Sequence, residues 1–461
     1  MSNSSLLVMP IIPSRQVFEG LFATLDYRSI SIFASTGFFL EQDTYYKELK
    51  ALKAAHNYSV DDFGNYDKGT PYFNWSYNPI DRPFDQIVEE FKQLFEEIIK
   101  EQTNNVKVIL PLSGGLDSRT QAVALKNLNA EVNSYSYEFA GGYQEAKISE
   151  QIAQIQGFDF KKFTIQRSYL WECIDDLAEI NQCYSEFTHP RQMAVIDDLG
   201  SMGDVFNLGH WGDVLFDDMG VDDNLSFQEQ VDVLVKKILK KGGLELGEAL
   251  WKEWDLEGCF FDYLRARVEV LLKDINIPNS ANAQIRAFKS LYWAPRWTSV
   301  NLSVFEKIKP IHLPYYDNRM CEFITTIPEK YLSKRQIQIE YIKRYAPKVA
   351  RVTWQENKPF NLYNHHLNRL PYNLPFRVLN KLKRTFSSQQ YVQRNWELQF
   401  LGEENEKELE QRLFTNSDLV SEKTRNDFYT KFRNVDGVQY SHPVSMLLTL
   451  MTWEKQRVNK S

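Results

Sequence analysis

The central part of the chain alternates between short apolar runs and stripes with helical spacing. Runs with the length of strands occur at 106–110, 132–139, 158–165 and 205–208. The first of them, VKVIL, is apolar enough to be covered on both faces. Helices are expected between these runs, at 119–128 and around 148–155. Strands that alternate with helices in this way predict an α/β fold with a doubly wound parallel sheet.

The regions on either side of this core follow other patterns. A strong amphipathic stripe from Phe84 to Ile98 predicts a helix directly in front of it. Residues 1–82 are rich in aromatic and turn residues and predict a small β-rich domain, with strands at 29–34, 37–40, 56–60 and 71–77. Beyond residue 226 the pattern is mainly helical, so we expect a second domain, 83–461, with a helical C-terminal part.

Composition narrows the class of protein. The 461 residues include 54 lysines and arginines against 61 aspartates and glutamates, and this net charge of −7 argues against a nucleic-acid binder. The four cysteines lack CxxC spacing, so neither structural zinc nor a disulfide framework is expected. The N-terminus is a poor signal peptide, and no apolar stretch approaches the roughly 18–20 residues of a membrane span. We therefore expect a cytoplasmic protein without stable membrane insertion.

One loop between a strand and a helix carries the chemistry of a phosphate site. Residues 113–118 read SGGLDS and follow the first apolar strand at its carboxyl end, where doubly wound sheets bind ligands. Gly114 and Gly115 let the backbone approach closely, and amides, serine hydroxyls and the next helix N-terminus can donate to phosphate oxygens. Asp117 requires a cation to share an anion site, which implies Mg²⁺.

This loop resembles the pyrophosphate-binding loop of the adenylating PP-loop ATP pyrophosphatases, and its Leu-Asp form is most similar to asparagine synthetases. The resemblance implies a fold of that type and an ATP- and Mg²⁺-dependent ligase. Such an enzyme adenylates a carboxylate, releases diphosphate and lets ammonia or an amine displace AMP. No GxxxxGK[ST] motif is present, which disfavours a P-loop kinase or ATPase. The resemblance implies ATP binding by Leu112, Ser113, Gly114, Gly115, Asp117, Ser118 and Gly209.

Residues 207–218, NLGHWGDVLFDD, are similar to the second nucleotide segment of the same family. The match implies that Asp213 holds Mg²⁺ opposite Asp117. The segment departs from the family at four places, and the most consequential is His210, which stands where a catalytic glutamate is usual. His210 is either a base near neutral pH or a packed, hydrogen-bonding histidine. Trp211, Val214 and the Asp217-Asp218 pair are the other departures.

Two later segments extend the resemblance in the same order. Residues 311–318, IHLPYYDN, match a segment that we interpret as mainly structural, although Asp317 is a further candidate for the site. Residues 352–360, VTWQENKPF, resemble the segment whose lysine contacts the phosphates and the adenylate. Lys358 is the matching position, and a lysine there would stabilise the charge that develops during AMP transfer. We therefore predict Lys358 and His210 as the catalytic residues.

The front of the chain resembles the end of a glutaminase domain, in the segment 38–60. Only 112 residues precede Ser113, and Ser2 rather than cysteine follows Met1, so we expect a shortened remnant without glutamine hydrolysis. The nitrogen would then come from free ammonia, from a separate ammonia donor protein or from an amine substrate.

The identity of the carboxylate stays open. Aspartate is the family default, whereas the altered segment 207–218 keeps open another acid, such as a glycan or natural-product acid. A non-catalytic nucleotide-binding pseudoenzyme is the alternative from another class. The acidic balance disfavours a tRNA-modifying enzyme.

Overall fold

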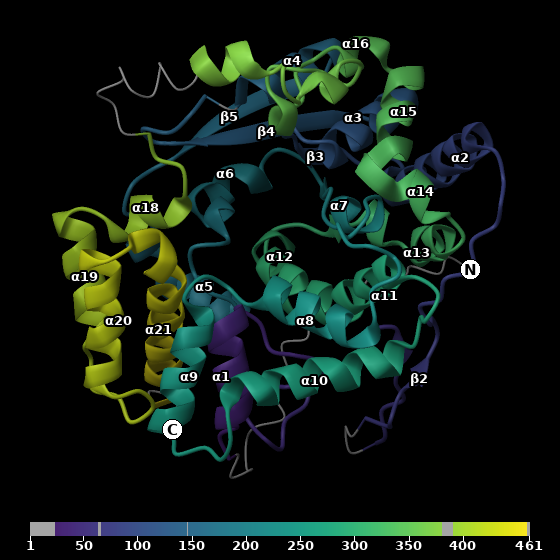
Figure 1. Ribbon diagram of the computed structural model, residues 1–461. Coiled ribbons are helices and arrows are strands. Elements are labelled where there is room, and N and C mark those ends of the chain that lie inside the picture. The colour runs from purple at the N-terminus through teal and green to yellow at the C-terminus, as the bar shows by residue number, and fades with distance from the viewer. Residues whose placement is uncertain (1–23, 63–65, 145, 380–390, 459–461) are drawn as a thin grey trace.

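A parallel sheet of five strands forms the centre of the upper half of the molecule (Figure 1). The computed structural model describes residues 24–62, 66–144, 146–379 and 391–458. The strand order is β5-β4-β3-β6-β7, and every neighbouring pair is parallel. The strands are β3 (Val108–Pro111), β4 (Val132–Phe139), β5 (Asp159–Ile165), β6 (Val205–Asn207) and β7 (Ile311–His312). The predicted doubly wound α/β sheet is confirmed.

Helices cover this sheet on both faces. Val108 and Leu110 pack in one hydrophobic cluster with helices from one side, whereas Ile109 packs in a second cluster. This alternation explains why the strand had to be apolar throughout. Four helices lie around the sheet at the top of Figure 1: α2 (Phe84–Thr103), α3 (Asp117–Asn127), α4 (Ala146–Gln156) and α15 (Gln336–Tyr345). The predicted helices 84–98, 119–128 and 148–155 correspond to the first three of them.

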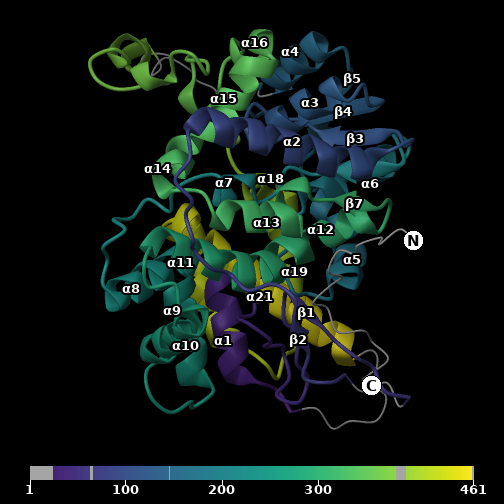
Figure 2. The same ribbon diagram turned by 90° about the vertical axis from the view of Figure 1, so that its right-hand side faces the viewer.

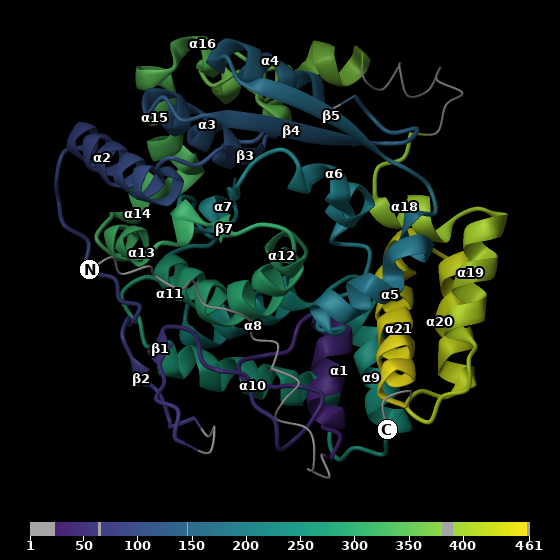
Figure 3. The ribbon, with the colours of Figure 1, turned by 180° about the vertical axis from the view of Figure 1, so that it is seen from behind.

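The rest of the chain is mainly helical, as predicted. Most of it lies below and beside the sheet, whereas α16 (Pro347–Ala350) lies at the top next to α4 (Figures 1 and 3). From β5 to β7 its elements are α5 (Tyr169–Asn181), η2 (Arg191–Val195), α6 (Ile196–Gly200), α7 (Gly212–Leu215), α8 (Phe227–Ile238), α9 (Gly243–Glu253), α10 (Phe260–Ile275), α11 (Ala281–Phe288), the π-helix η3 (Lys289–Thr298) and α12 (Ser299–Glu306). After β7 follow η4 (Pro314–Tyr316), α13 (Asn318–Thr325), α14 (Glu329–Leu332), η5 (Ser333–Arg335), α16 (Pro347–Ala350), η6 (Gln355–Asn357), η7 (His365–Leu367), α18 (Asn395–Phe400), α19 (Glu403–Leu413), α20 (Glu422–Asn434) and α21 (Gly437–Val458). None of the helices in the described ranges is long and apolar enough to cross a bilayer.

The predicted strand at 29–34 is wrong, because these residues form helix α1 (Tyr27–Thr36). Asp26 caps its first turn by accepting from the Ser29 amide at 3.2 Å, and Gly37 ends it with φ +81°. Ser31 and Ser35 of this helix are buried and donate to carbonyl oxygens one turn earlier, Ser31 to Tyr27 at 2.9 Å and Ser35 to Ser31 at 2.8 Å. A helix surrounded by protein does not need a polar side, so its sequence alternates like a strand.

The other expected strands of the front part are shorter or absent. β1 (His56–Asn57) pairs antiparallel with β2 (Thr70–Pro71), and residues 37–40 and 72–77 form no strand. A β-rich character is therefore not found in the described part of 1–82. In Figure 2 α1 lies low in the molecule among the later helices, and it packs most closely with α9. The boundary at residue 82 stays a prediction.

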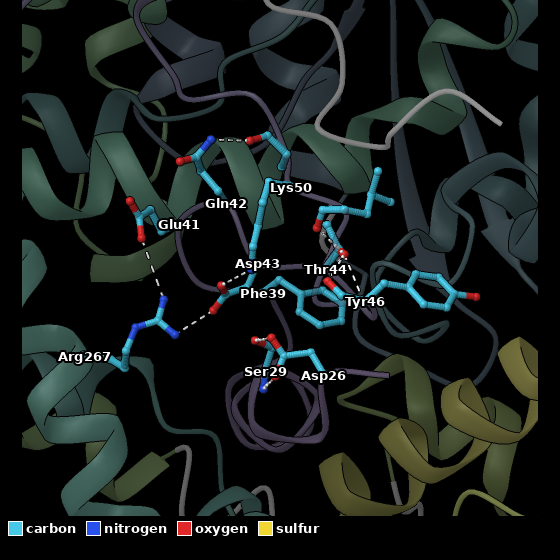
Figure 4. A network of polar contacts seen from close by, with 12 residues as sticks. Asp26, Ser29, Phe39, Glu41, Gln42, Asp43, Thr44, Tyr46, Lys50 and Arg267 are labelled. Atoms are coloured by element: carbon cyan, nitrogen blue, oxygen red, sulfur yellow. Dashed lines mark hydrogen bonds and ion pairs between the residues drawn. The ribbon is translucent and has the colours of Figure 1, made fainter. Parts of the chain in front are cut away.

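Ion pairs attach the front segment to the later helices (Figure 4). Asp43 is almost fully buried, and its carboxylate pairs with Arg267 of α10 at 2.8 Å and with Lys50 at 3.4 Å. Arg267 also reaches Glu41, at 3.7 Å. A buried carboxylate needs such partners to remain ionised, so the segment 41–50 and α10 depend on one another for stability.

Candidate functional site

The largest cavity described here, of about 650 Å³, opens at the carboxyl ends of β3 and β6. β3 and β6 are neighbours in the sheet. The strand that follows β3 in the chain, β4, lies on one side of this pair, and β7, which follows β6, lies on the other. Such a switch point separates the two following loops and creates a ligand crevice in doubly wound sheets. Of the predicted residues, the cavity is lined by Leu112, Ser113, Gly115, Asp117, Ser118, Gly209, His210 and Asp213.

Three backbone amides of the SGGLDS loop donate to side-chain oxygens of the protein. The Ser113 amide donates to Ser118 Oγ at 3.0 Å, and the Gly115 amide donates to Ser113 Oγ at 3.2 Å. The Gly114 amide donates to Gln355 Oε1 at 3.1 Å, which turns Gly114 away from the cavity lining. Side-chain oxygens therefore already occupy the donors that the sequence assigned to phosphate. A bound phosphate would replace these oxygens one for one.

Two glycines bring the loop after β6 against the loop after β3. A Cβ atom on Gly212 would overlap Asp117 Oδ1, and one on Gly209 would lie 2.8 Å from Gln121 Oε1 and 3.1 Å from the Ser118 amide. Neither position tolerates a side chain without movement of the site. Trp211, between them, adopts a left-handed backbone with φ +74°.

The Asp117 carboxylate is surrounded by charged and hydrogen-bonding side chains. Its Oδ1 atom pairs with Arg335 and accepts from Gln338 Nε2 at 3.0 Å. Burial raises the pKa of Asp117 to about 6; the charge of Arg335 opposes this shift and the nearby charge of Asp213 adds to it. The two carboxylates that the sequence assigned to Mg²⁺ therefore lie close enough to repel one another, which is the condition that a shared cation relieves.

The carboxylates of the cavity fit an Mg²⁺ ion that takes its other ligands from nucleotide phosphates and water. Asp213 lines the cavity and is exposed to its solvent, while one oxygen of Asp117 is engaged by Arg335. Across the described residues no group of three or more His, Cys, Asp or Glu side chains could hold a metal ion. Two carboxylates do not make an all-protein cage, but Mg²⁺ in nucleotide sites is held largely by phosphates and water.

His210 lines the same cavity and has an unusually low basicity. Desolvation by the surrounding walls lowers the pKa of His210 to about 4, although the charge of Asp213 opposes the shift. The imidazole is therefore neutral at pH 7. The side chain is nevertheless exposed to the cavity, so both of its predicted roles, base and hydrogen-bonding group, stay open.

Lys289 and Arg335 are cations of the cavity that the sequence did not reveal. The Lys289 ammonium lies 6.0 Å from the ring centre of Trp211 and 5.4 Å from that of Trp293. Burial lowers the pKa of Lys289, and the charge of Asp213 opposes this effect. No motif marked Lys289, because it lies on π-helix η3, far along the chain from either loop.

Lys358, in contrast, is exposed and does not line the cavity. Its segment does reach the site, since Gln355 and Glu356 are lining residues. Arg119, fully buried at the start of α3, holds that segment in place. Its guanidinium donates to the Gly114 carbonyl at 3.0 Å, to Val352 at 3.0 Å and to Thr353 at 2.8 Å.

Some of the remaining candidate residues contact the residues of the site, and others line the cavity. Tyr315, from segment 311–318, donates through its hydroxyl to the Asp117 carbonyl at 3.1 Å. Asp317 caps α13 and pairs with Arg319 at 3.0 Å, outside the cavity lining. Leu112, Tyr135 and Tyr137 form an apolar end of the cavity beside the loop. The Tyr135 hydroxyl there is buried without a hydrogen-bond partner.

These features define an α/β protein with a phosphate-type loop at the switch point of a parallel sheet. The family model for asparagine synthase matches residues 90–196, which confirms the predicted resemblance over α2, the SGGLDS loop and the strands β3 to β5. The match ends before the segments that contain His210, Asp213 and Lys358. Their resemblance therefore stays a prediction.

Two solved structures are similar to parts of this chain at low identity and low TM-score. A solved U34-tRNA thiolase, NcsA from Methanococcus maripaludis with its [4Fe-4S] cluster, is 13% identical over 48% of this chain and 84% of its own, with a TM-score of 0.23. An NAD+ synthetase from Burkholderia pseudomallei is 13% identical over 41% of this chain and 85% of its own, with a TM-score of 0.18. The comparison with curated proteins finds no match.

Proposed function

We propose that this protein is an ATP-dependent ligase that adenylates a carboxylate, releases diphosphate and lets an amine or ammonia displace AMP to form an amide. The observation that supports this function best is a single cavity. It brings together the SGGLDS loop, the Asp117 and Asp213 carboxylates and the cations Lys289 and Arg335. The asparagine synthase match over 90–196 supports an ATP-using enzyme of this class.

Asp117 and Asp213 are the residues that would hold Mg²⁺. When bound, the ion would neutralise charge on the phosphates and orient them. The serine hydroxyls and amides of residues 113–118 would bind the diphosphate part of ATP, in exchange for their present internal partners. Leu112 and Tyr135 would enclose the base.

Lys289 would stabilise the negative charge that builds up as the carboxylate attacks the α-phosphate. Its ammonium has no carboxylate partner among the described residues, so its charge is available to a ligand. Lys358 keeps this role only if its segment moves when ATP binds. His210, neutral at pH 7, would accept a hydrogen bond from the incoming amine.

The nitrogen source belongs to the proposal as well. We infer that a separate ammonia donor protein, free ammonia or an amine substrate supplies it, in the cytoplasm. Aspartate is the first carboxylate to test. An acid from a glycan or a natural product is the alternative within the same reaction.

A nucleotide-binding pseudoenzyme is the second candidate, and one observation favours it. The amides of Ser113, Gly114 and Gly115 are all engaged by side-chain oxygens of the protein itself. A loop stabilised in this way can persist without a substrate. The paired carboxylates argue for catalysis, because nucleotide binding alone does not require both of them.

The decisive experiment incubates the protein with ATP, Mg²⁺ and ammonium, with aspartate or a panel of other acids, and measures AMP and diphosphate. We expect acid-dependent AMP release that is lost in Asp213→Asn. Asp197→Asn, an exposed carboxylate of α6 outside the cavity, is the matched control and should retain activity. ATP binding without AMP under any acid would favour the pseudoenzyme, and ADP as product would refute adenylation.

A further inference from the structure

A second, smaller cavity adjoins the first. It has a volume of about 170 Å³ and is lined by residues of the 186–189 turn, α21 and the π-helix, together with Lys240. Trp297 lines both cavities and therefore forms the wall between them. Trp293, another lining residue of the larger cavity, has the Lys240 and the Lys289 ammonium each 5.4 Å from its ring centre.

Lys240 supplies a positive charge to the lining of the smaller cavity. Its ammonium lies 5.4 Å from the ring centre of Trp293 and 5.3 Å from that of Trp297. Burial lowers its pKa, and the charge of Glu186 only partly opposes this. In the described ranges no hydrogen bond or ion pair of this ammonium is found. A mostly buried lysine without a counterion is costly unless a ligand supplies one.

Glu186, the nearest carboxylate, cannot serve as that counterion, because its oxygens are already used. His189 Nδ1 donates to Oε1 at 2.7 Å, and Ser445 Oγ donates to Oε2 at 2.6 Å. The hydroxyl and the amide of Thr188 also donate to Oε2, at 2.6 and 2.7 Å. Burial opposes ionisation of Glu186, but these donors and the charge of His189 outweigh it and hold its pKa at about 2.

The other lining groups leave the cavity favourable to an anion. His442 donates through Nε2 to the Ala34 carbonyl at 3.0 Å, and burial lowers its pKa to about 4, so it is neutral. Ser441 adds a hydroxyl. Glu186 keeps its negative charge, but its oxygens are occupied by other donors, so the Lys240 ammonium remains a hydrogen-bond donor without an acceptor among the described residues. That combination suits a carboxylate.

We propose that the smaller cavity binds a remote carboxylate of the acyl substrate, which is therefore an elongated diacid. One carboxylate would be adenylated beside Lys289 and the other would pair with Lys240, with the chain of the substrate passing Trp293 and Trp297. The inference rests on the proposed function for the first carboxylate only. The second carboxylate keeps its charge throughout, so its binding can be measured without any reaction.

The test is direct binding of two probes of equal chain length, octanedioate and octanoate, by titration calorimetry without nucleotide. We expect octanedioate to bind at least 10-fold more tightly to the wild type. Lys240→Met should abolish this preference and leave octanoate unaffected. Lys240→Arg should retain it, which separates loss of charge from misfolding. Lys236→Met, an exposed lysine of α8 away from both cavities, is the matched control and should bind as the wild type does.

The outcomes distinguish this site from the proposed reaction. Equal binding of the two probes, or an unchanged preference in Lys240→Met, would overturn the second-carboxylate site even if AMP is formed. A Lys240-dependent preference without AMP formation would establish the site and count against the ligase. In a protein that does form AMP, Lys240→Met should raise KM for the diacid at least 10-fold with little change in kcat.

Discussion

Arg119 is the residue whose replacement should most clearly separate the stability of the fold from the function of the site. Its buried guanidinium donates to four carbonyls, that of Gly114 in the SGGLDS loop and those of Val349, Val352 and Thr353. Arg119→Met keeps the bulk of the side chain. It removes the donor of the Val352 and Thr353 carbonyls, whereas those of Gly114 and Val349 still accept from backbone amides. Each buried, unsatisfied carbonyl costs about 1–3 kcal/mol, so we expect a loss of about 2–6 kcal/mol for these two.

A loss of this size is a large part of the total stability of about 5–15 kcal/mol that is usual for a domain. Urea unfolding at 25 °C measures it. The same substitution should weaken ATP binding at least 10-fold, because the SGGLDS loop loses the link that Arg119 provides to Val352 and Thr353 and keeps only its hydrogen bonds with Gln355. Arg119→Lys, which can still donate to one or two of the carbonyls, should lie between the wild type and Arg119→Met in both measurements.

Arg425 provides the control. It is equally buried, far along the chain in α20, and donates to the carbonyls of Leu413, Thr415 and Ser421. Arg425→Met should therefore lose a similar free energy of unfolding while the folded protein binds ATP normally. If Arg119→Met keeps its stability, the hydrogen-bond argument is wrong. If both variants lose ATP affinity alike, the effect of Arg119 is general destabilisation and not control of the loop.

Further predictions concern single contacts. Gly212→Ala should abolish AMP formation with an unfolding free energy within about 2 kcal/mol of the wild type, since the added Cβ displaces the Asp117 carboxylate; activity at the wild-type level would contradict the close approach of the loops. Lys289→Met should lower kcat at least 100-fold and Lys358→Met less than 10-fold, and the reverse order in steady-state assays would restore Lys358 to the central role. Glu186→Gln should cost up to about 3 kcal/mol at pH 7, because the folded pKa of about 2 lies below the unfolded value; this cost should shrink as the pH falls from about 4.5 toward 2, and a pH-independent difference in urea unfolding would refute it.

Much of the fold could be predicted because the spacing of the apolar residues and the length of each segment indicated the same element. The stripe from Phe84 to Ile98 and the apolar run before Ser113 each admit one interpretation, and α2 and β3 follow them closely. The segment 29–34 failed for a physical reason. Burial on all sides removes the polar face by which a helix is recognised, and serine side chains can satisfy themselves on the backbone.

The residues of the candidate site also differ in how far the sequence could predict them. The resemblance implied that Asp213 lies opposite Asp117. Both line the cavity because their loops follow the neighbouring strands β3 and β6. Lys289 and Arg335 could not be predicted, because their place in the cavity depends on how a π-helix and a turn pack against those loops. Lys358 illustrates the opposite case: a matching local motif does not determine which way a side chain faces.

The chemical groups of the cavity come from two parts of the fold, the sheet and the helical part. The strands supply the carboxylates and the phosphate-type loop, whereas the helical part supplies the cations and the aromatic rings between which they lie. Substrate choice would then depend on the helical part. Lys289, Trp293 and Trp297 all lie on the π-helix, and its widened turns place them along one wall that continues into the smaller cavity. Variation of this single element could change the acid that is activated while the sheet and its loops keep the nucleotide chemistry constant.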